Sequence, residues 1–326
     1  MQVRFWGVRG SLPSPDTTGE LEARLLEIIA RLGQEKSPPD LHDAAAVRGW
    51  LQTLPAPLRT ITGGNTPCVE MRTANGDLFI VDAGSGIRPF GNELMAGDFG
   101  QGQGHAHVFF SHYHWDHLQG LPFFRPIYIR GNRFDLYARH EKLEEHLRHQ
   151  QQAPFFPPAS WDDISAELSY HQLDAEPIEL CEGRVRVSSI ALDHPSRAYA
   201  YRFETDGKVF IYASDGAYHD LDEDAIRPYI SFFKGADLLI FDAQFTLSES
   251  YEKRTWGHSS AVIGVELACQ AAVKRLALFH HDPAATENQL DHLLNVAQQY
   301  VEVMPVAPGA ERCQVLIARE GETIEL

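Results

Sequence analysis

Short apolar runs, separated by polar stretches that contain glycine and proline, recur along the whole chain and predict a protein rich in β-strands. Runs of about four to eight apolar or alternating residues that stop at Gly, Pro, Asn or Asp are typical of strands. Two of these runs flank Asp206-Gly207 and predict a β-hairpin. The predicted strands cover residues 3–8, 68–72, 78–81, 107–110, 185–191, 199–204, 209–213, 238–241, 275–279 and 314–318, with two further short pieces within 127–137 around Gly131-Asn132.

Apolar residues spaced three or four positions apart predict helices between these strands. The clearest lies at residues 21–32, and Asp40 is the predicted N-cap of a second helix that runs through Leu51. Further helices are predicted at 141–152, from Ser259 or Ser260 to about residue 273, and at 286–301. Strands that alternate with helices in this way favour an α/β (α+β) fold, with helices packed on the outer faces of sheets.

The first two predicted helices form a hairpin between two strands, and we interpret this hairpin as an insertion at about residues 16–60 of a single domain that spans residues 1–326. A second insertion is expected at about 138–170. We expect the first helix to pack its apolar stripe against the core, and we favour this role over a lid or a contact in a homodimer. The stripe consists of Leu21, Leu25, Ile28 and Leu32, and Gly33 ends it.

The composition fits one large globular domain, because 326 residues that are 44% hydrophobic and 22% charged can form a substantial core. With 28 Lys and Arg against 45 Asp and Glu, the formal net charge is −17. An acidic protein repels polyanions unless it has a local basic patch, and no run of Lys or Arg would form one here. The charge balance therefore disfavours a nucleic-acid partner.

The cysteines and the N-terminal residues indicate a reducing compartment. The N-terminal residues lack the basic segment and the long apolar stretch of a signal peptide, and no apolar run is long enough to cross a membrane. These features predict a cytoplasmic protein without a membrane partner. The four cysteines are widely spaced, which is typical of buried free thiols and not of a disulfide framework: Cys68, Cys181, Cys269 and Cys313.

The chemistry of the chain is concentrated in the segment Ser111-His-Tyr-His-Trp-Asp-His117, directly after the predicted buried strand at 107–110. Residues two apart on an extended strand end point the same way. Imidazole and carboxylate groups are ligands for zinc, manganese or iron. We predict two ions side by side, because the segment offers more ligands than one catalytic metal usually takes, and a chance cluster of surface histidines is the alternative. The candidate ligands are His112, His114, Asp116 and His117.

Other predicted strands end in side chains of the same kind. His194, Asp215 and His280 each stand where an apolar run stops, and Asp82 ends the run at 78–81. Taken singly, these residues have structural explanations, such as a capping histidine or a turn aspartate. Strands of one sheet that all end in ligand-type residues place them at one edge of that sheet, so together they indicate a single metal centre.

The histidine-rich segment resembles the His-x-His-x-Asp-His signature of the metallo-β-lactamase superfamily. Later segments are similar to the phosphodiesterase branch of that superfamily, which includes ribonuclease Z, the tRNA 3′-end endonuclease, and relatives that open cyclic phosphodiesters. The likeness runs from about residue 3 to residue 281 and implies a four-layer αββα sandwich. The segments that carry it are residues 198–204, 214–215, 237–242, 257–261 and 278–280, of which Gly-His-Ser-Ser at 257–260 is the most branch-specific.

The resemblance also implies the ligands of a binuclear metallohydrolase. Each of two divalent ions would be held by three side chains and by one shared carboxylate, with zinc favoured over manganese or iron. His280 is preferred to His281 because it aligns with the family ligand. The first set is His112, His114 and His194, the second set is Asp116, His117 and His280, and Asp215 bridges both.

Further roles follow from the same resemblance. Asp82 would orient the metal-binding loop without binding metal. His258, supported by Asp242, would clamp the phosphate and protonate the leaving oxygen, while Asp116 would also steer the attacking water. Two departures stand out. Asp242 occupies the place where ribonuclease Z tends to have a glutamate, and the long Gly- and Pro-rich arm by which that enzyme grips tRNA has no counterpart.

These implications lead to one functional hypothesis, a metal-dependent phosphodiesterase whose two ions activate water for attack on a small nucleotide, with a cyclic nucleotide as the first choice. The net charge, the missing arm and the aromatic residues Tyr113 and Trp115 favour a small substrate. The two phenylalanines within residues 153–158 offer another apolar surface for stacking, although we favour the interpretation that they pack into the core. Arg125, Arg130 and Arg197 offer a local path for an anion. The alternatives are a ribonuclease Z-like tRNA 3′-processing endonuclease and a non-catalytic ligand-binding member of the fold, against which the intact ligand set argues.

Overall fold

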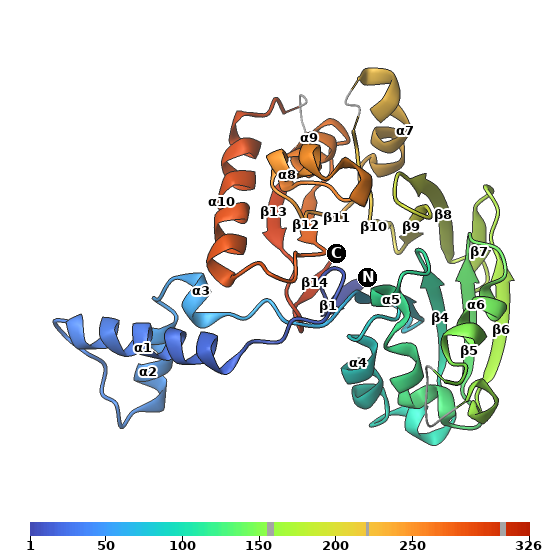
Figure 1. Cartoon of the computed structure of the whole chain (residues 1–326), viewed down its shortest axis with the longest axis horizontal. Helices are drawn as coiled ribbons and strands as arrows, with labels where there is room; N and C mark the ends of the chain where they lie inside the picture. The colour runs from blue at the N-terminus through green and yellow to red at the C-terminus, as the bar shows by residue number, and fades with distance from the viewer. Residues whose placement is uncertain (155–159, 220–221, 307–310) are drawn as a thin grey trace.

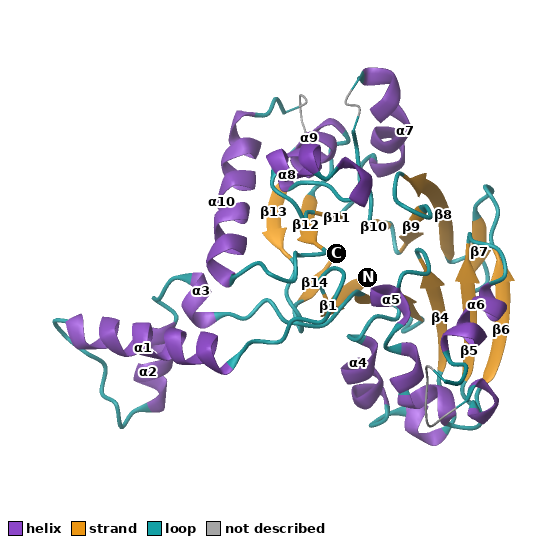
Figure 2. Cartoon of the chain, in the orientation of Figure 1, coloured by secondary structure: helices purple, strands orange, loops and turns teal. Residues whose placement is uncertain are grey.

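Two seven-stranded β-sheets lie face to face at the centre of the molecule, and helices cover both outer sides (Figure 1). The computed structural model describes residues 1–154, 160–219, 222–306 and 311–326. Coloured by secondary structure, the strands run from the centre of the view to its right-hand edge, and most helices lie above, below and to the left of them (Figure 2). The predicted four-layer αββα sandwich is confirmed.

The first sheet has the strand order β14-β1-β2-β3-β4-β5-β6. Strands β3 to β6 are parallel to one another, while β14, β1, β2 and β3 alternate in direction. The parallel part therefore directs the C-terminal ends of β3, β4 and β5 to one edge. The strands are β1 Gln2–Gly7, β2 Cys68–Arg72, β3 Leu78–Val81, β4 His105–Phe110, β5 Arg133–Ala138, β6 Glu167–Gln172 and β14 Thr323–Glu325.

The second sheet has the order β13-β12-β11-β10-β9-β8-β7. Strands β10 to β13 are parallel, and β7 to β10 form an antiparallel meander. The meander includes the hairpin that was predicted around Asp206-Gly207. The strands are β7 Ile178–Leu180, β8 Val185–Leu192, β9 Ala198–Thr205, β10 Lys208–Ala213, β11 Leu238–Asp242, β12 Arg275–Phe279 and β13 Gln314–Ile317.

The helices fall into a layer on each sheet and a projecting arm. Helices α7 (Glu223–Phe233), α9 (Ala261–Gln270) and α10 (Glu287–Val303) cover the second sheet, and α4 (Ile87–Leu94) and α6 (Leu143–Gln150) cover the first. The remaining helices are α1 Thr18–Gln34, α2 Ala44–Leu51, α3 Ala56–Arg59, α5 Trp115–Leu118 and α8 Leu247–Glu252. Short 3₁₀ turns lie at η1 Asp98–Gln101, η2 Leu121–Phe123, η3 Arg125–Tyr128, η4 Trp161–Asp163 and η5 Arg254–Trp256.

The alternation along each strand separates the layers. On β9, Tyr201 and Phe203 point into the space between the sheets, where they pack with Phe109 of β4. Ala198 and Ala200 on the same strand face the helix side. Because successive side chains of a strand point to opposite faces, one aromatic–alanine alternation fills the inner core and leaves room for helices outside.

Most predicted strands and helices are present, but three predictions need correction. The N-cap of α2 is Asp43, whose side chain accepts a hydrogen bond from the Ala45 amide, and not Asp40. The first of the two strand pieces within 127–137 is the turn η3, because Pro126 at its start favours a turn. Only β5 remains from that pair. The predicted end of the second insertion, residue 170, falls inside β6, a strand of the first sheet.

The sequence pattern also missed several elements, among them α4, α7, α8, β6, β7 and β14. Strands β7 and β14 have three residues each, which is too short for a clear alternation. Helix α7 contains Pro228, a residue that argues against a helix interior. Residues 155–158 of the segment that was considered as an apolar wall or a core plug lie outside the described residues.

The apolar stripe of α1 does not pack against the core, contrary to the expectation. No residue of α1 is buried, and Leu21 and Leu25 are each 49% exposed. The hairpin of α1 and α2 projects from the body of the molecule, while α3 at its base contacts α10 (Figure 1). The capping box of Thr17 and Glu20 starts α1 locally, so the helix forms without burial in the body. The α1–α2 hairpin is called the arm below, a name that does not refer to the tRNA-gripping arm of ribonuclease Z.

Two compositional expectations can be compared with the structure. All four cysteines are free, with Cys68 and Cys313 buried and the other two half-buried. Across the described ranges, no helix combines the length and the apolarity that a membrane span requires.

We predict that the arm contributes little to the stability of the sandwich. Replacing residues 18–52 with a short Gly-Ser linker should shift the melting temperature by only a few degrees, because α1 and α2 bury no residue. As a matched control, Leu267→Ala, in the fully buried face of α9, should cost about 2–5 kcal/mol. Thermal unfolding of both variants tests this. Loss of folded protein on removing the arm would mean that it packs on the sandwich after all.

Candidate metal centre

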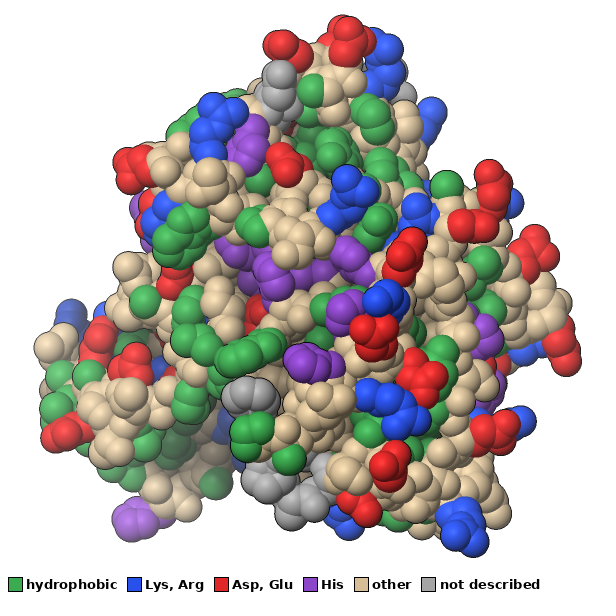
Figure 3. Space-filling view, turned by 45° about the vertical axis from the view of Figure 1, so that its right-hand side comes forward, with side chains coloured by type: hydrophobic (Ala, Val, Ile, Leu, Met, Phe, Trp, Pro, Cys, Tyr) green, Lys and Arg blue, Asp and Glu red, His purple; other side chains and the backbone are tan. Residues whose placement is uncertain are grey.

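The ends of several strands bring their histidines and aspartates to one edge of the sandwich. His112 and His114 follow β4, His194 follows β8, Asp215 follows β10 and His280 follows β12. In the space-filling view, histidine side chains form a band across the middle of one face, with acidic and basic side chains scattered around it (Figure 3). The structure therefore brings together all seven side chains that the sequence singled out as ligands.

The first group consists of His112, His114 and His194, whose ligand atoms all lie within 4.8 Å of one another. His194 Nε2 is 3.1 Å from His114 Nδ1. For a tetrahedral ion with bonds of about 2.1 Å, neighbouring ligand atoms stand about 3.4 Å apart. The spacing of the group fits one such ion.

The second group consists of Asp116, His117 and His280, together with Asp215. Asp116 Oδ2 is 3.3 Å from His117 Nε2 and 3.2 Å from His280 Nε2. All of these side chains are buried. This group also has the ligand spacing of a single metal ion.

Asp215 stands between the two groups and presents one carboxylate oxygen to each. Its Oδ1 lies 3.9 Å from His112 Nε2 and 3.8 Å from His194 Nε2. Its Oδ2 lies 3.2 Å from His117 Nε2 and 3.3 Å from His280 Nε2. This division of its oxygens fits a carboxylate that bridges two ions.

The imidazole rings are held by their second nitrogens. His117 Nδ1 is 2.7 Å from Asp82 Oδ2, His194 Nδ1 is 2.9 Å from the Gly257 carbonyl oxygen, and His280 Nδ1 is 3.0 Å from Gln244 Oε1. A hydrogen bond at Nδ1 fixes the ring and leaves Nε2 as the metal-binding atom. His112 Nε2 and His117 Nε2 are buried and have no hydrogen-bond partner. Since buried polar atoms are normally satisfied, these two nitrogens fit the bonds of an absent ion.

Asp82 lies behind the histidines and orients the loop that carries them. Its carboxylate is fully buried and accepts hydrogen bonds from the Ser111 amide at 2.8 Å and from Tyr212 Oη at 2.7 Å, besides its contact with His117. Asp82 also has a φ of 61°, in the left-handed region that non-glycine residues rarely adopt. Asp215 and His280 share this conformation, so the chain holds three residues of the centre in a costly backbone state.

The charges of the centre shift its pKa values strongly. Burial alone lowers the pKa of His117, but the carboxylates of Asp116, Asp215 and Asp82 raise it by a larger amount. The pKa of His117 therefore lies well above its usual value. For His280, burial again lowers the pKa, while mainly Asp215 and Asp116 raise it to about 9. These shifts come from buried carboxylates gathered at one point, which is an environment that attracts a cation.

His258 and Asp242 lie beside the two groups. His258 Nδ1 is 2.8 Å from Asp242 Oδ2, and the same carboxylate accepts hydrogen bonds from the amides of Asp215 and Gln244. Both side chains are buried, and the His258 ring stacks on the ring of His280 at 5.0 Å. Asp242 thus holds His258 through Nδ1.

The sequence did not identify three further residues of the centre. Gln244 holds His280, and the Ser11 amide donates a hydrogen bond to Asp116 Oδ2 at 2.8 Å. Gly257 has a φ of 81° and approaches His194 so closely that a Cβ atom would lie 2.3 Å from Nδ1. Gly257 was noted only as part of a branch-specific motif. Gln244 offered one signal, since it stands two residues after a strand-end aspartate.

The choice between the adjacent histidines 280 and 281 is also clear in the structure. His281 is fully buried, and its Nε2 bonds to the Ala318 carbonyl oxygen at 3.1 Å, away from both groups. Burial lowers the pKa of His281 to about 3, so this ring is a neutral part of the core. His280 is the member of the pair that faces Asp116 and Asp215.

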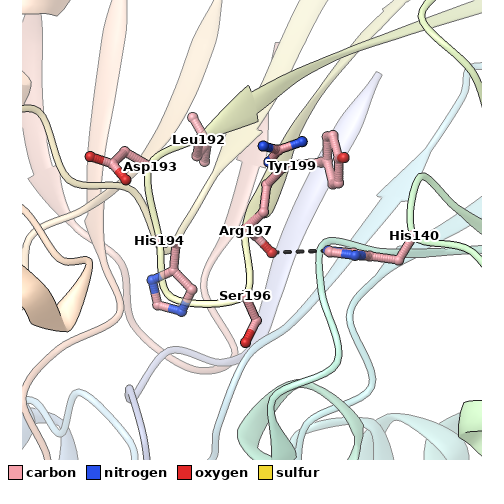
Figure 4. A pocket seen from close by; sticks show the side chains of 7 residues that line it. All are labelled: His140, Leu192, Asp193, His194, Ser196, Arg197 and Tyr199. Carbon is pink, nitrogen blue, oxygen red and sulfur yellow. Dashed lines mark hydrogen bonds between the residues drawn. The ribbon is translucent and has the colours of Figure 1, made fainter.

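A shallow pocket of about 460 Å³ opens beside His194 (Figure 4). His140 Nε2 donates to the main-chain oxygen of Arg197 at 2.9 Å on its rim. The pocket is lined mostly by polar residues, and its lining consists of His140, Leu192, Asp193, His194, Ser196, Arg197 and Tyr199. A ligand bound there would touch a member of the first histidine group.

A comparison of the sequence with known protein families agrees with a metal centre at this site. The model of the β-lactamase superfamily domain matches residues 79–281, which is more than half of the chain and includes every candidate ligand. The chain belongs to the β-lactamase superfamily. The predicted family is confirmed, and this membership implies divalent metal ions, which the donor set of the centre fits.

Relatives of this superfamily protein include ribonuclease Z of Halobacterium salinarum, 25% identical over 280 residues, with 67% of this chain and 84% of the relative covered. Two solved structures share the fold. The metallo-β-lactamase fold protein YhfI from Bacillus subtilis has a TM-score of 0.60 at 16% identity, covering 99% of this chain and 98% of its own. A diphosphatase from the PhnP family has a TM-score of 0.57 at 19% identity, covering 100% and 97%.

We predict that the β-lactamase superfamily protein holds two ions at this centre and that Asp215→Ala removes both or nearly both, because each group loses its shared carboxylate. The measurement is the zinc content per chain after dialysis against zinc and removal of free metal. Asp193→Ala, an exposed carboxylate next to His194, is the matched control and should keep both ions. Equal zinc contents of Asp215→Ala and wild type would contradict the bridging role.

Proposed function

We propose that this protein is a binuclear metal-dependent phosphodiesterase that hydrolyses a small nucleotide phosphodiester, with a cyclic nucleotide as its preferred substrate. The observation that carries the proposal is Asp215, which presents Oδ1 to one histidine group and Oδ2 to another. Bound divalent ions lower the pKa of a water molecule and offset negative charge on phosphoryl oxygens.

The residues around the centre support the orientation of a water nucleophile. The carboxylate of Asp116 is fixed by the Ser11 amide and lies next to His117 and His280. A carboxylate held in this way can accept a hydrogen bond from the attacking water and align its lone pair with phosphorus. The burial of Asp116 strengthens such a bond by excluding competing solvent.

His258 is the candidate general acid. Its Nδ1 is held by Asp242, which leaves Nε2 as the nitrogen for proton transfer. The ring lies beside His194 and His280, one from each ligand group, at centroid distances of 5.3 Å and 5.0 Å. A phosphate between the two groups would therefore have its leaving oxygen within reach of His258.

The surroundings of the centre favour a small substrate. The pocket next to His194 has the size of a small-molecule site, and the exposed Arg197 on its rim can pair with a phosphate. Trp115 stands between His114 and Asp116 in the sequence and is 81% exposed. Such a ring offers a stacking surface for one nucleobase, worth about 1–3 kcal/mol.

A ribonuclease Z-like activity on tRNA is the second candidate, and the relationship to ribonuclease Z of Halobacterium salinarum favours it. The diphosphatase among the fold relatives points instead to a small phosphate compound. The arm is a large projection that could reach a tRNA, but acidic residues outnumber basic ones between residues 16 and 60. Since affinity for nucleic acids comes mainly from Lys and Arg, the acidic arm weakens the second candidate.

We predict that zinc- or manganese-loaded protein hydrolyses a cyclic mononucleotide with greater efficiency than it cleaves a precursor tRNA. The panel contains 3′,5′- and 2′,3′-cyclic nucleotides, a cyclic dinucleotide, an aryl phosphodiester and a precursor tRNA, with kcat/KM as the measurement. Asp215→Ala is the inactive control. Efficient cleavage of the tRNA, with no turnover of any cyclic nucleotide, would establish the second candidate instead.

We also predict that His258→Ala keeps its metal content but lowers kcat roughly 10²-fold on an alkyl phosphodiester, as expected for the loss of a general acid. The loss should be smaller on a p-nitrophenyl phosphodiester, because this leaving group needs little protonation. Rates on both substrates, measured with metal-loaded protein, distinguish the roles. An equal loss on both would assign His258 to phosphate binding and not to proton transfer.

A further inference from the structure

A second cluster of ligand-type side chains lies at the other end of β4 from the candidate metal centre. His105 and His107 are on β4, Asp135 is on β5 and His171 is on β6. His107 and His112 are five residues apart on an extended chain, which corresponds to about 16 Å. The cluster is therefore separate from the centre that contains His112. It is called the β4–β6 cluster below.

The register of the parallel strands brings these side chains together. His107 pairs with Asp135 between β4 and β5, and Tyr137 pairs with His171 between β5 and β6. Residues two apart on a strand share a face, so His105 joins His107 and Asp135 joins Tyr137. The face is the one that meets the second sheet, since His107 stacks on Phe79 at 4.8 Å.

Asp135 is the centre of the β4–β6 cluster and contacts a different histidine on each side. Its Oδ2 is 2.7 Å from His105 Nε2 and 3.9 Å from His107 Nδ1, and its Oδ1 is 2.8 Å from His171 Nε2. The ligand atoms of His105, His107 and Asp135 all lie within 4.8 Å of one another. These separations bracket the distance of about 3.4 Å between neighbouring ligands of a tetrahedral ion with bonds of about 2.1 Å.

The partners of Asp135 are unusual for a structural carboxylate. Among the residues that the structure describes, its ion pairs involve three histidines and no Lys or Arg. Its carboxylate is about one-quarter exposed, and His105 and His171 are more open, so an ion can reach the cluster from solvent. The imidazoles of His105 and His107 and the carboxylate of Asp135 form a ligand set that suits zinc, cobalt or nickel and not calcium or magnesium.

We propose that His105, His107 and Asp135 form a further binding site for a divalent transition-metal ion such as Zn²⁺, with a structural role. The ligands come from the neighbouring strands β4 and β5, and His171 on the edge strand β6 holds the other carboxylate oxygen of Asp135. A bound ion links β4 to β5 and, through Asp135, to this edge. The site is independent of the proposed phosphodiesterase activity, since it shares no residue with the candidate centre.

The protonation states and the surroundings agree with this role. Burial lowers the pKa of His107 to about 4, so its ring is neutral near pH 7 and has a lone pair to offer. Burial alone raises the pKa of Asp135, but the hydrogen bonds from His105 and His171 lower it by a larger amount. The net shift of the pKa is downward, and the carboxylate is ionised.

Cys181 lies across the cluster, after β7 of the second sheet, with its Sγ 3.7 Å from His107 Nε2. Tyr137 Oη, at 3.1 Å from His107 Nδ1, would turn away when that nitrogen binds an ion.

The test uses the full chain and counts zinc per chain after dialysis against zinc and removal of free metal. Wild type should hold three ions, and Asp135→Asn and His105→Ala two each. His42→Ala, which removes an exposed histidine of the arm, is the matched control and should hold three. Asp215→Ala should hold one ion, and Asp215→Ala combined with Asp135→Asn should hold none, which separates this site from the proposed catalytic centre.

A second measurement follows the structural role. Adding zinc to Asp215→Ala should raise its melting temperature by a few degrees, since an ion that binds only the folded state stabilises it. The same addition should leave the Asp215→Ala, Asp135→Asn double variant unchanged, with circular dichroism confirming that it is folded. The proposal is overturned if Asp135→Asn and His105→Ala retain as much zinc as wild type, or if zinc shifts the melting of both Asp215 variants equally.

Discussion

The buried carboxylate of Asp215 is the constraint on which the centre depends. A charge removed from water costs several kcal/mol unless partners compensate it, and here the partners are four imidazoles from three separate segments of chain. With no Lys or Arg among these contacts, the arrangement has its compensating charge only when the histidines are protonated or when cations are present. Because membership of the β-lactamase superfamily implies divalent metal ions, cations are the expected partners of Asp215. His112 Nε2 and His117 Nε2, which are buried and make no hydrogen bond, agree with this conclusion.

The sandwich supplies the rigidity that such a centre needs. Strands from both sheets end at one edge, and His117, His194 and His280 are each anchored through Nδ1, by the Asp82 carboxylate, the Gly257 carbonyl and the Gln244 side chain respectively. Asp82, Asp215 and His280 each adopt left-handed backbone directly after a strand. The packed aromatic core between the sheets holds these strained residues in place, because a close-packed interior resists the small shifts that would relax them.

The two ends of β4 show how one strand can serve two purposes. Its C-terminal end leads into the histidine-rich segment, where the ligands lie on a loop and a short helix. Its N-terminal end contributes His105 and His107 directly from the strand, and their partners are set by strand register alone. The arm stands apart from both, since the sandwich is complete without the apolar residues that α1 exposes.

The sequence alone determined the fold class and singled out the candidate ligands, because both rest on local signals and on the family resemblance that these signals carry. A strand followed at once by histidines and an aspartate is visible in one segment, and the resemblance linked that segment to His194, Asp215 and His280. Tertiary structure alone decided the rest. The stripe of Leu21 and Leu25 has the spacing of a core-facing helix, yet it lies in solvent, because spacing defines an apolar face and does not say whether another element covers it. Gln244 and Ser11 joined the centre, and Asp135 met three histidines, only through strand pairing and loop contacts between residues far apart in the chain. Such contacts depend on register and packing, which no single segment of sequence encodes.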